Sequence, residues 1–491
     1  MQNGTRLGLT QPRFVFNTAL RIDETSLLDA GLDGSGRVTL NGNVTNNGMI
    51  SQIDGVTGDQ LTINGDLSGT GTLGLDVDVS DASADTVAIT GNATDFGGIS
   101  VNGFGDNAGP DDITLVSVAG QTNANAFALT STNFVTPDGA DAQVIGAFTY
   151  TLEFDDTSSE FFLMSLGGNP VLPVFEAYPG LLTALNLPGT TFQTWGSRLG
   201  TIGEGTSSDT PTQALFSFEP TADNAIWFSF NGTRSEYQGR STLGSSVDTD
   251  GTRFEMGVNF PVFEGENGRL IAGASFALHD SQSDVLGGLT AGQVTTEGQS
   301  ATLSVIWLSN ARFYANTQLR FSTFSTDMFL SGLGPVSLGS QGEGVAASIE
   351  VGQAFDVTDT LTLVPQFQLT HSDVRGDGIA DPFGAPFAGT VTDGDTSMAR
   401  IGLHVEKSLS RGSLFGSLSY IHAFNNDTEV TFMGTPFRTE LDDNRIELTA
   451  GGQIAIGDNS VLYGGITYQG GLSRPGDDMS YSLTGGINVN F

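Results

Sequence analysis

The side chains able to perform acid–base or nucleophilic chemistry are few, and the histidines all lie in one half of the chain. They are His279, His371, His404 and His422, and none precedes residue 225. A Ser–His–Asp triad needs a histidine beside its serine, so the amino-terminal half alone cannot supply one. The sequence also has no G-x-S-x-G elbow and no H-E-x-x-H pair. We expect no enzyme. His404 and His422 fall in predicted strands, as lumenal or rim residues, and His279 and His371 should be solvated near loops.

Two patterns in the amino-terminal half imitate ligand sites. Gly69–Gly74 matches G-x-G-x-x-G, but a dinucleotide site needs a helix after the glycines, and here the alternating segment LDVDVS follows. The pairs Asp76/Asp78 and Asp111/Asp112 could attract Ca²⁺, yet neither lies in a loop with full ligand spacing. We therefore expect glycine turns and solvated acidic turns, with no cofactor and no metal.

Composition narrows the class of protein. The 491 residues include 55 acidic and 18 basic side chains, a net charge of −37, with Lys407 as the only lysine. This charge argues against nucleic acid and against anionic lipid surfaces as partners. The absence of cysteine excludes disulfides and suits a chain that crosses an oxidising compartment unfolded. Residues 1–30 contain no signal-peptide core although the rest reads as exported, so we expect the signal upstream of Met1.

The last strand separates apolar from polar side chains along its whole length. Its even-numbered positions include the polar residues Ser482, Thr484 and Asn488. Its odd-numbered positions are mostly apolar and end with the aromatic carboxy-terminal residue. Alternation of this kind places the two sets on opposite faces of a strand. A strand that closes a barrel in lipid leaves no unpaired edge. The apolar set comprises Tyr481, Leu483, Ile487, Val489 and Phe491.

Twelve such alternating segments follow residue 225, which predicts an all-β domain over residues 207–491. Glycine and turn residues separate the segments, and we expect long polar loops at 278–298, 325–341, 371–396 and 425–443. Segment length, an even count and aromatic residues near segment ends favour a 12-stranded transmembrane antiparallel β-barrel over a soluble sandwich. The aromatic residues expected to form belts at the membrane interfaces include Trp227, Tyr314, Phe324 and Tyr463. Pro365 lies within one segment and is read as a bulge or the end of a ladder. The small or polar parity includes Thr302, Ser304, Asn316, Gln318, Gln366, Gln368, Ser419 and Thr449.

Residues 171–206 read as a linker that carries a lumenal α-helix. Apolar residues recur at helical spacing over 176–200, and Pro188-Gly189 should divide the run into two short helices. A helix about 10–12 Å wide fits the lumen of a twelve-stranded barrel, so we expect a plug; a packed surface helix is the alternative. The residues expected to carry it are Leu181, Leu182, Leu185, Phe192, Trp195 and Leu199.

Residues 1–170 read as a right-handed β-solenoid and its carboxy-terminal cap. Loose units of about 20 residues recur at 36–48, 59–80 and 85–103, as stacked coils require. Further strands are expected to cap the stack; these are 113–118, 127–129, 144–152 and 161–166.

Several stretches together resemble type V autotransporters. PVFEAYPGLLTAL (173–185) and TWGSRLG (194–200) are similar to the junction between passenger and translocator, and AIWFSFNG (225–232) to the first barrel strand. LVPQFQLTHSD (363–373), SMARIGLHVEK (397–407), LYGGITY (462–468) and GGINVNF (485–491) resemble later strands. DTVAITG (85–91), ITLVSV (113–118) and GAFTYTLEF (146–154) resemble the end of a pertactin-like passenger.

The resemblance implies a mechanism and partners. The barrel would be a monomer in the outer membrane of a Gram-negative bacterium, delivered by periplasmic chaperones and inserted by the barrel assembly machinery, which reads Phe491 and its apolar neighbours. The passenger, adhesive or otherwise surface-exposed with an unassigned ligand, would cross as an unfolded hairpin and fold outside, leaving residues 176–200 in the lumen. Many members cleave themselves beside an asparagine in this helix. Asn186 is the one candidate, without the neighbouring Asn.

Two other functions remain open from the residues. One is a passive outer-membrane channel whose helix does not close the pore. The other is a soluble all-β binding protein.

Overall fold

The computed structural model describes residues 1, 4–94, 96–105, 112–188, 224–238, 240–379, 382–383, 392–432, 435–457, 459–473 and 477–491. The chain forms two compact units, one containing residues 1–172 and the other the bulk of residues 173–491. Each unit is described by itself below.

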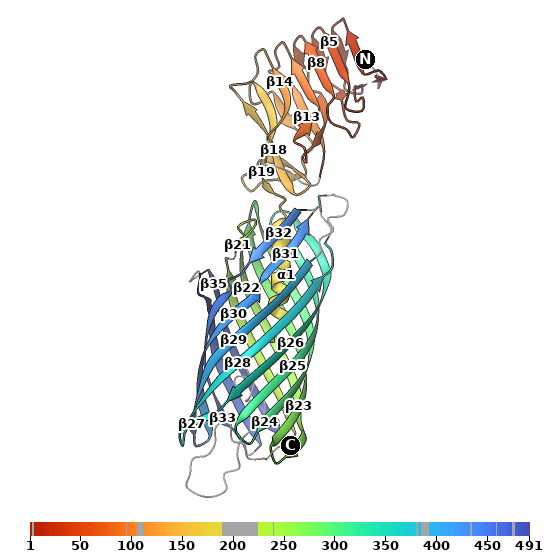
Figure 1. The fold of residues 1–491 in the computed structure, drawn as a ribbon. Coiled ribbons are helices and arrows are strands. Elements are labelled where there is room, and N and C mark those ends of the chain that lie inside the picture. The colour runs from red at the N-terminus through yellow and green to blue at the C-terminus, as the bar shows by residue number, and fades with distance from the viewer. Residues whose placement is uncertain are drawn as a thin grey trace. The chain divides into compact units, whose positions relative to one another are not determined.

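The first unit is a β-solenoid of stacked parallel coils (Figure 1). One sheet joins β1 (Arg6–Gly8), β4 (Leu27–Asp29), β7 (Met49–Ser51), β10 (Thr72–Asp78), β13 (Gly97–Phe104) and β15 (Phe127–Leu129), with β11 (Ser83–Ala84) beside β10. A second joins β2 (Arg13–Phe16), β5 (Arg37–Asn41), β8 (Gln60–Asn64), β12 (Thr86–Ile89) and β14 (Ile113–Val118). The third joins β3 (Leu20–Ile22), β6 (Val44–Asn46) and β9 (Leu67–Ser68).

The core of the solenoid is a set of apolar ladders. Leu28 pairs with Ile50, Ile50 with Leu73 and Leu73 with Ile99, and each is at most 1 % exposed. In-register stacking lets every coil bury its apolar residues on the next coil, and each such side chain contributes about 1.5–3 kcal/mol. The repeat inferred from the sequence therefore corresponds to real coils.

Buried aspartates secure the turns between coils. Asp85 accepts hydrogen bonds from the backbone N–H groups of Gly58, Asp59 and Asp76, at 2.9–3.0 Å. Asp59 in turn accepts from Leu32 and Gly36, at 2.6 and 2.7 Å. Burial, with the nearby charges of Asp76 and Asp59, raises the pKa of Asp85 to about 7 despite these hydrogen bonds. These aspartates are thus structural. Asp76, which was predicted to lie in a solvated turn, is fully buried, and so is Asp85.

The G-x-G-x-x-G pattern is a coil turn, as expected. Gly69 has φ +115° between β9 and β10, and a Cβ on Gly71 would lie 2.5 Å from the carbonyl oxygen of Gly48. Because glycine has no Cβ, neighbouring coils can approach closely at these positions.

Antiparallel strands end the stack. They are β16 (Phe134–Val135), β17 (Asp141–Ile145), β18 (Phe148–Asp155) and β19 (Glu160–Gly168), and β19 pairs with β14. The expected cap is therefore correct for 144–152 and 161–166, but wrong for 113–118 and 127–129. These two segments are β14 and β15, which continue the parallel coils.

The second unit is a closed antiparallel barrel of twelve strands (Figure 1). In order around the ring they are β20 (Ala225–Tyr237), β22 (Ser246–Gly265), β23 (Gly268–Gly287), β24 (Thr290–Ser309), β25 (Phe313–Leu330), β26 (Gly334–Gln353), β28 (Leu361–Gly376), β29 (Thr392–Leu409), β30 (Gly412–Asn425), β33 (Asn444–Ala455), β34 (Ser460–Gly471) and β35 (Asp478–Asn490). Pairing of β20 with β35, from Ala225↔Asn490 to Tyr237↔Asp478, closes the ring. Short strands extend it: β21 (Arg240–Ser241), β27 (Phe355–Thr358), β31 (Asp427–Phe432) and β32 (Thr435–Glu440).

The outer face of the barrel is apolar and its inner face polar. Leu303 and Val305 are 57 % and 47 % exposed on the outside, whereas Thr302 and Ser304 between them are 6 % and 7 % exposed. An exposed apolar belt with a polar interior is the pattern of a barrel surrounded by lipid. Four aromatic residues that the sequence suggested for the belt instead face inward because of their parity: Trp227, Tyr314, Phe324 and Tyr463, each at most 6 % exposed.

Three of the four expected loops consist largely of strands, and one of these, segment 425–443, contains β31 and β32. Segments 278–298 and 325–341 continue β23–β24 and β25–β26 as extended hairpins with short turns. Their polar composition suggested loops because both faces of these strand ends carry polar residues. We call the end with Ala225 and Phe491 the terminal end, and the opposite end, where these hairpins turn, the far end.

Pro365 marks the end of a ladder, as predicted. Pairing of β26 with β28 stops at Gly352↔Gln366, and β27 resumes on the same side with Phe355↔Leu363. Pro365 falls in the gap on this side, as a residue without an N–H donor can, and stays paired with Leu403 of β29 on the other.

Candidate functional site

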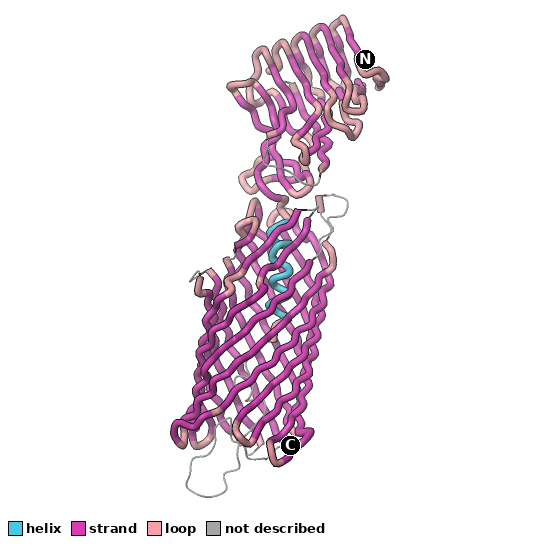
Figure 2. Tube along the Cα trace, viewed as in Figure 1, coloured by secondary structure: helices cyan, strands magenta, loops and turns pink. Residues whose placement is uncertain are grey.

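One helix lies inside the barrel. It is α1 (Leu172–Asn186), shown in cyan within the ring of strands in Figure 2. It begins earlier than the sequence suggested and continues through Pro179, whose carbonyl oxygen accepts a hydrogen bond from Thr183 Oγ1 at 2.9 Å. It ends two residues before Pro188, as the sequence predicts, and the expected second helix lies outside the described residues. No helix in the described ranges is both long and apolar enough to cross a membrane.

A groove of glycines in the barrel wall receives one stripe of the helix. A Cβ on Gly292 would lie 2.3 Å from Val174 Cγ1, one on Gly376 2.7 Å from Tyr178 Cε1, and one on Gly342 3.0 Å from Leu182 Cδ1. A Cβ on Gly344 would lie 2.7 Å from the Asn186 side chain, and one on Gly394 2.8 Å from Thr183 Oγ1. Residues 174, 178, 182 and 186 are four apart and so share one helix face. The glycines of β24, β26, β28 and β29 therefore seat the helix against one wall. We call these five positions the glycine groove.

Polar contacts fix both ends of the helix. Near its start, Glu176 accepts hydrogen bonds from Ser241 Oγ (2.6 Å), Thr242 N (2.8 Å) and Ser245 Oγ (3.2 Å) in the β20–β22 connection. At its end, Asn186 Nδ2 donates to Ser372 Oγ at 2.8 Å and Asn186 Oδ1 accepts from Ser322 Oγ at 2.7 Å.

The helix carboxy-terminus has a further anchor in the wall. Arg320 Nη1 donates to the carbonyl oxygen of Leu187 at 3.0 Å, and Arg320 Nε donates to Thr302 Oγ1 at 3.2 Å. A guanidinium at a helix carboxy-terminus satisfies an unpaired carbonyl and opposes the helix dipole. These bonds tie the last turn of the helix to β25 near mid-barrel.

Apolar residues line the lumen beside the first half of the helix. At the far end of the barrel, five side chains of inward parity are at most 3 % exposed: Val285, Val294, Met328, Leu330 and Val374. We call them the collar. Val174, Phe175 and Tyr178 of the helix are likewise buried, at most 1 % exposed. The collar was not predicted from the sequence, because its apolar residues stand at inward-facing positions that are otherwise mostly polar.

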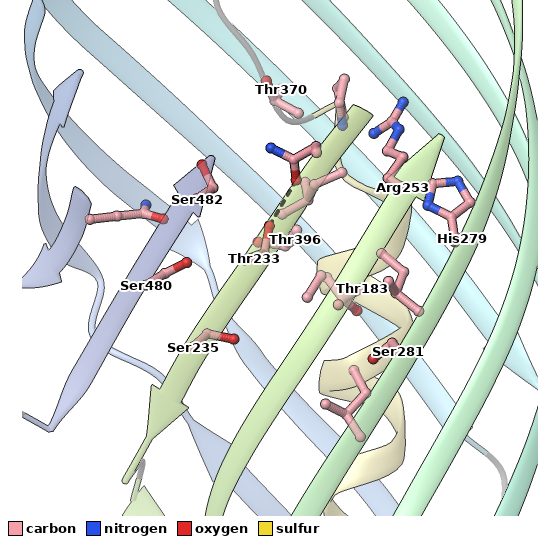
Figure 3. A pocket seen from close by; sticks show the side chains of 18 of the residues that line it. Thr183, Thr233, Ser235, Arg253, His279, Ser281, Thr370, Thr396, Ser480 and Ser482 are labelled. Carbon is pink, nitrogen blue, oxygen red and sulfur yellow. Dashed lines mark hydrogen bonds between the residues drawn. The ribbon is translucent and has the colours of Figure 1, made fainter. Parts of the chain in front are cut away.

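The opposite face of the helix borders a polar cavity of about 350 Å³. The helix contributes Ala177, Gly180, Leu181 and Ala184, and the wall contributes mostly serine, threonine and paired charges. Figure 3 shows Thr183 on the helix with Thr233, Ser235, Ser480 and Ser482 on the strands around it. The helix thus occupies one side of the lumen and leaves a hydrophilic space beside the other.

Two of the lumenal arginines are paired with glutamates. Arg253 lies 2.9 Å from Glu255, and Arg400 lies 3.1 Å from Glu447. His279, expected to be solvated, is only 5 % exposed in the middle of β23, with its ring nitrogen 2.9 Å from Ser300 Oγ. Within the described part of the chain, no group of three His, Cys, Asp or Glu residues is placed to hold a metal.

The structure places the residues singled out from the sequence as follows. Leu182 is fully buried, Leu181 is 7 % exposed and Leu185 is half-buried, all on the lumenal helix. Phe192, Trp195 and Leu199 lie outside the described residues. In the last strand and at the carboxy-terminus, Tyr481, Leu483 and Phe491 are exposed on the barrel exterior, and Ile487 and Val489 are half-buried. Sequence reasoning missed Glu176, Arg320 and the glycine groove.

Comparison with known proteins assigns the barrel. Residues 226–467 match the family model described as the autotransporter beta-domain. The barrel belongs to the autotransporter beta-domain family. In this family the barrel is inserted in the outer membrane, so the belt of exposed apolar residues meets lipid. Short turns face the periplasm and longer connections the outside. The two longest connections between barrel strands, from Gly376 to Thr392 and from Asn425 to Asn444, begin and end at the far end, so the far end of this autotransporter barrel is the extracellular end.

Relatives extend the similarity to both units. The chain is 25 % identical over 484 residues to the adhesin BmaC autotransporter of Brucella suis biovar 1 (strain 1330), covering 92 % of this chain and 13 % of that protein. It is 29 % identical over 174 residues to the pertactin autotransporter of Bordetella bronchiseptica, covering 34 % and 19 %. The chain thus spans less than a fifth of either relative. The transport unit of the autotransporter AIDA-I from Escherichia coli aligns with a TM-score of 0.46 and 18 % identity, covering 61 % of this chain and 98 % of that structure.

Proposed function

We propose that this chain is an outer-membrane translocator that places its own amino-terminal solenoid on the cell surface. The observation that carries the proposal is the seated helix: α1, which lies between the solenoid and the barrel strands in the sequence, runs inside the lumen, held by the glycine groove and by polar anchors at both ends. A chain can reach this arrangement when the solenoid passes through the barrel before the helix settles. Folding of the coils outside then opposes return.

The division of labour follows from this proposal. Residues 1–170 act as the passenger remnant, 171–206 as the linker with the lumenal helix, and 207–491 as the barrel; residues 189–223 lie outside the described part of the chain. The passenger serves as an adhesive or other surface-binding element rather than an enzyme, supported by the name of the Brucella relative and by the lack of histidine in that half.

Export is tested by proteolysis of intact cells. Protease should degrade an epitope tag placed in an exposed solenoid turn, such as after Gly139, while the barrel remains in the membrane and shifts mobility on heating. A tag that stays protected in intact cells but is cleaved after outer-membrane permeabilisation would reject export.

The carboxy-terminal residue supports a second part of the proposal, recognition by the barrel assembly machinery after delivery by periplasmic chaperones. Phe491 is 64 % exposed and Phe424, an aromatic residue of the outer face elsewhere, is 65 % exposed. Phe491→Ser should lower the yield of heat-modifiable barrel several-fold, whereas Phe424→Ser should leave it nearly unchanged. Equal losses of barrel yield in the two variants would mean that Phe491 contributes only contact with lipid and is not an assembly signal.

We propose that Asn186 anchors the helix and is not a cleavage site. Self-cleavage at asparagine needs the side-chain amide nitrogen to attack the backbone carbonyl carbon of the same residue, which breaks the bond to Leu187 and releases its amine. Here that nitrogen donates to Ser372 and the amide oxygen accepts from Ser322. The passenger therefore stays attached. A cell-associated species of full length supports this role, and release of a fragment ending at Asn186 would refute it.

A passive channel is the second candidate. It is favoured by the polar cavity beside the helix and opposed by the collar at the extracellular end. Planar-bilayer recordings separate the two. A translocator closed by its helix should conduct weakly and conduct more after deletion of 172–186, whereas large steady openings that this deletion does not increase would favour the channel.

A further inference from the structure

Four amide side chains form a band on the lumenal wall between mid-barrel and the terminal end. They are Asn316 and Gln318 on β25 and Gln366 and Gln368 on β28, each at most 5 % exposed. Strand β26 lies between them, since Gln318 pairs with Ser348 and Asn316 with Glu350, which itself pairs with Gln368. We call these four residues the amide band. Arg320, the anchor of the helix end, lies one inward position further along β25.

The amide band has unused hydrogen-bonding capacity. Both side-chain polar atoms of Asn316 and of Gln366, and the Nε2 atoms of Gln318 and Gln368, have no partner in the described part of the chain. The one bond to the band in that part of the chain is from Arg400 Nη1 to Gln368 Oε1, at 2.8 Å. Buried polar groups in folded proteins almost always have partners, so neighbouring unsatisfied amides indicate a ligand that is not part of the wall. Gln318 and Gln368 also line the cavity beside the helix.

We propose that the amide band contacts the backbone of the passenger while it moves through the lumen; this rests on the proposed translocator function. An extended chain presents one N–H donor and one C=O acceptor per residue. A carboxamide offers both kinds of group and is neutral, so it can bond any backbone regardless of side chains. The binding is exchangeable because each residue of the moving chain presents the same groups.

Charge favours this polypeptide as the occupant. Residues 1–170 carry 21 acidic and 4 basic side chains. A basic wall would retain such a chain and an acidic wall would repel it. The charged groups next to the band already have partners: Arg400 is paired with Glu447 at 3.1 Å, Glu350 accepts a hydrogen bond from Tyr314 at 2.6 Å, and Arg320 donates to the carbonyl oxygen of Leu187 at 3.0 Å. The band is the neutral part of the passage.

The proposal also explains the motif Pro365-Gln-Phe-Gln-Leu369. Phe367 and Leu369 are 43 % and 42 % exposed on the lipid face, while Gln366 and Gln368 point inward without a full set of partners. Alternation places one pair in lipid and the other in the lumen. The two glutamines are thus available to the lumen rather than needed by the wall.

Cross-linking in cells provides the first test. A photoreactive residue is placed at Gln368 or Gln318 of the full chain, and at Gln299, an exposed lipid-face residue of β24, as the control. With export stalled by a disulfide loop engineered into the solenoid, cross-links to residues 1–170 should form from 318 and 368 and not from 299. Their absence, while unstalled passenger reaches the surface, would overturn the proposal.

Substitution provides the second test. Asn316→Leu with Gln366→Leu removes two amides that bond nothing in the described wall, so heat-modifiable barrel should form at normal yield. Surface appearance of the passenger should slow roughly fivefold or more, the rate factor of one ordinary hydrogen bond. Gln299→Leu is the matched control. Export at the unmodified rate by the double variant would refute the proposal; if that variant does not assemble, cross-linking decides. Failure of unmodified passenger to reach the surface would instead refute the translocator function.

Discussion

The glycine groove makes a sharp prediction at Gly344. A Cβ there would lie 2.7–2.8 Å from three side-chain atoms of Asn186, closer than real Cβ contacts come. Asn186 cannot give way cheaply, because its side chain is fixed by hydrogen bonds to Ser322 and Ser372. Gly344→Ala should therefore break both bonds or push the helix from the wall.

The size of the effect follows from ordinary magnitudes. Two hydrogen bonds contribute about 1 kcal/mol each, and overpacking adds about 1–3 kcal/mol. A loss of about 3 kcal/mol changes the ratio of seated to released helix about a hundredfold, since 1.4 kcal/mol is a factor of ten. We expect the open probability of purified protein in planar bilayers to rise by that factor.

The control for this prediction is Gly457→Ala. Gly457 has no atom within 4 Å of an added Cβ, so the same chemical change should leave conductance unaltered. If Gly344→Ala and Gly457→Ala conduct alike, and both resemble the unmodified barrel, then the helix does not depend on the groove and the reasoning fails.

Three further predictions use other contacts. Gly180→Ala places a Cβ no closer than 3.9 Å to Thr428 and removes a helix-interior glycine, so the helix should gain about 1 kcal/mol and openings should become rarer in the same recordings. Glu176→Leu leaves the donors of the β20–β22 connection unsatisfied, at about 1–3 kcal/mol, so openings should become about 5–150 times more frequent; an unchanged frequency would exclude this anchor. The folded pKa of Asp85, about 7, lies above its unfolded value near 3.9, so its stabilising contribution is complete at acid pH and lost as pH rises through 7. Pulse proteolysis of the solenoid should show higher stability at pH 5 than at pH 8, and Asp85→Asn should flatten this dependence; greater stability at pH 8 would contradict it.

Strict alternation made the barrel predictable from sequence. In the lipid-facing part of a strand, such as Ala301–Trp307 of β24, every second residue is apolar, so the number of strands, the lipid face and the small polar lumenal residues could be inferred from the order of the residues alone. Trp227 and Tyr314 were assigned wrongly to the aromatic belt, because they were judged by their position along the strand and not by this alternation. The extended hairpins at 278–298 and 325–341 were missed because polar residues occupy both faces once a strand leaves the lipid.

The contacts that hold the helix in the lumen could not be predicted from the sequence. Helical spacing identified the lumenal segment, but the contacts that hold it are distant in sequence: Asn186 meets Ser322 and Ser372, and Glu176 meets Ser241. A glycine at 344 or 376 reads as an ordinary strand irregularity until the opposing side chain is known. Local patterns can therefore suggest that a helix enters the barrel, but not which wall receives it.

The most direct test of the account is a disulfide between helix and wall. The natural chain has no cysteine, and a Cβ at position 394 would lie 2.8 Å from Thr183 Oγ1, so Thr183→Cys with Gly394→Cys forms an unambiguous pair. We predict that the disulfide forms in molecules whose solenoid is already open to protease on intact cells. Assembled molecules with an exposed solenoid in which the two cysteines stay reduced under oxidation would contradict the seated helix and the export route built on it.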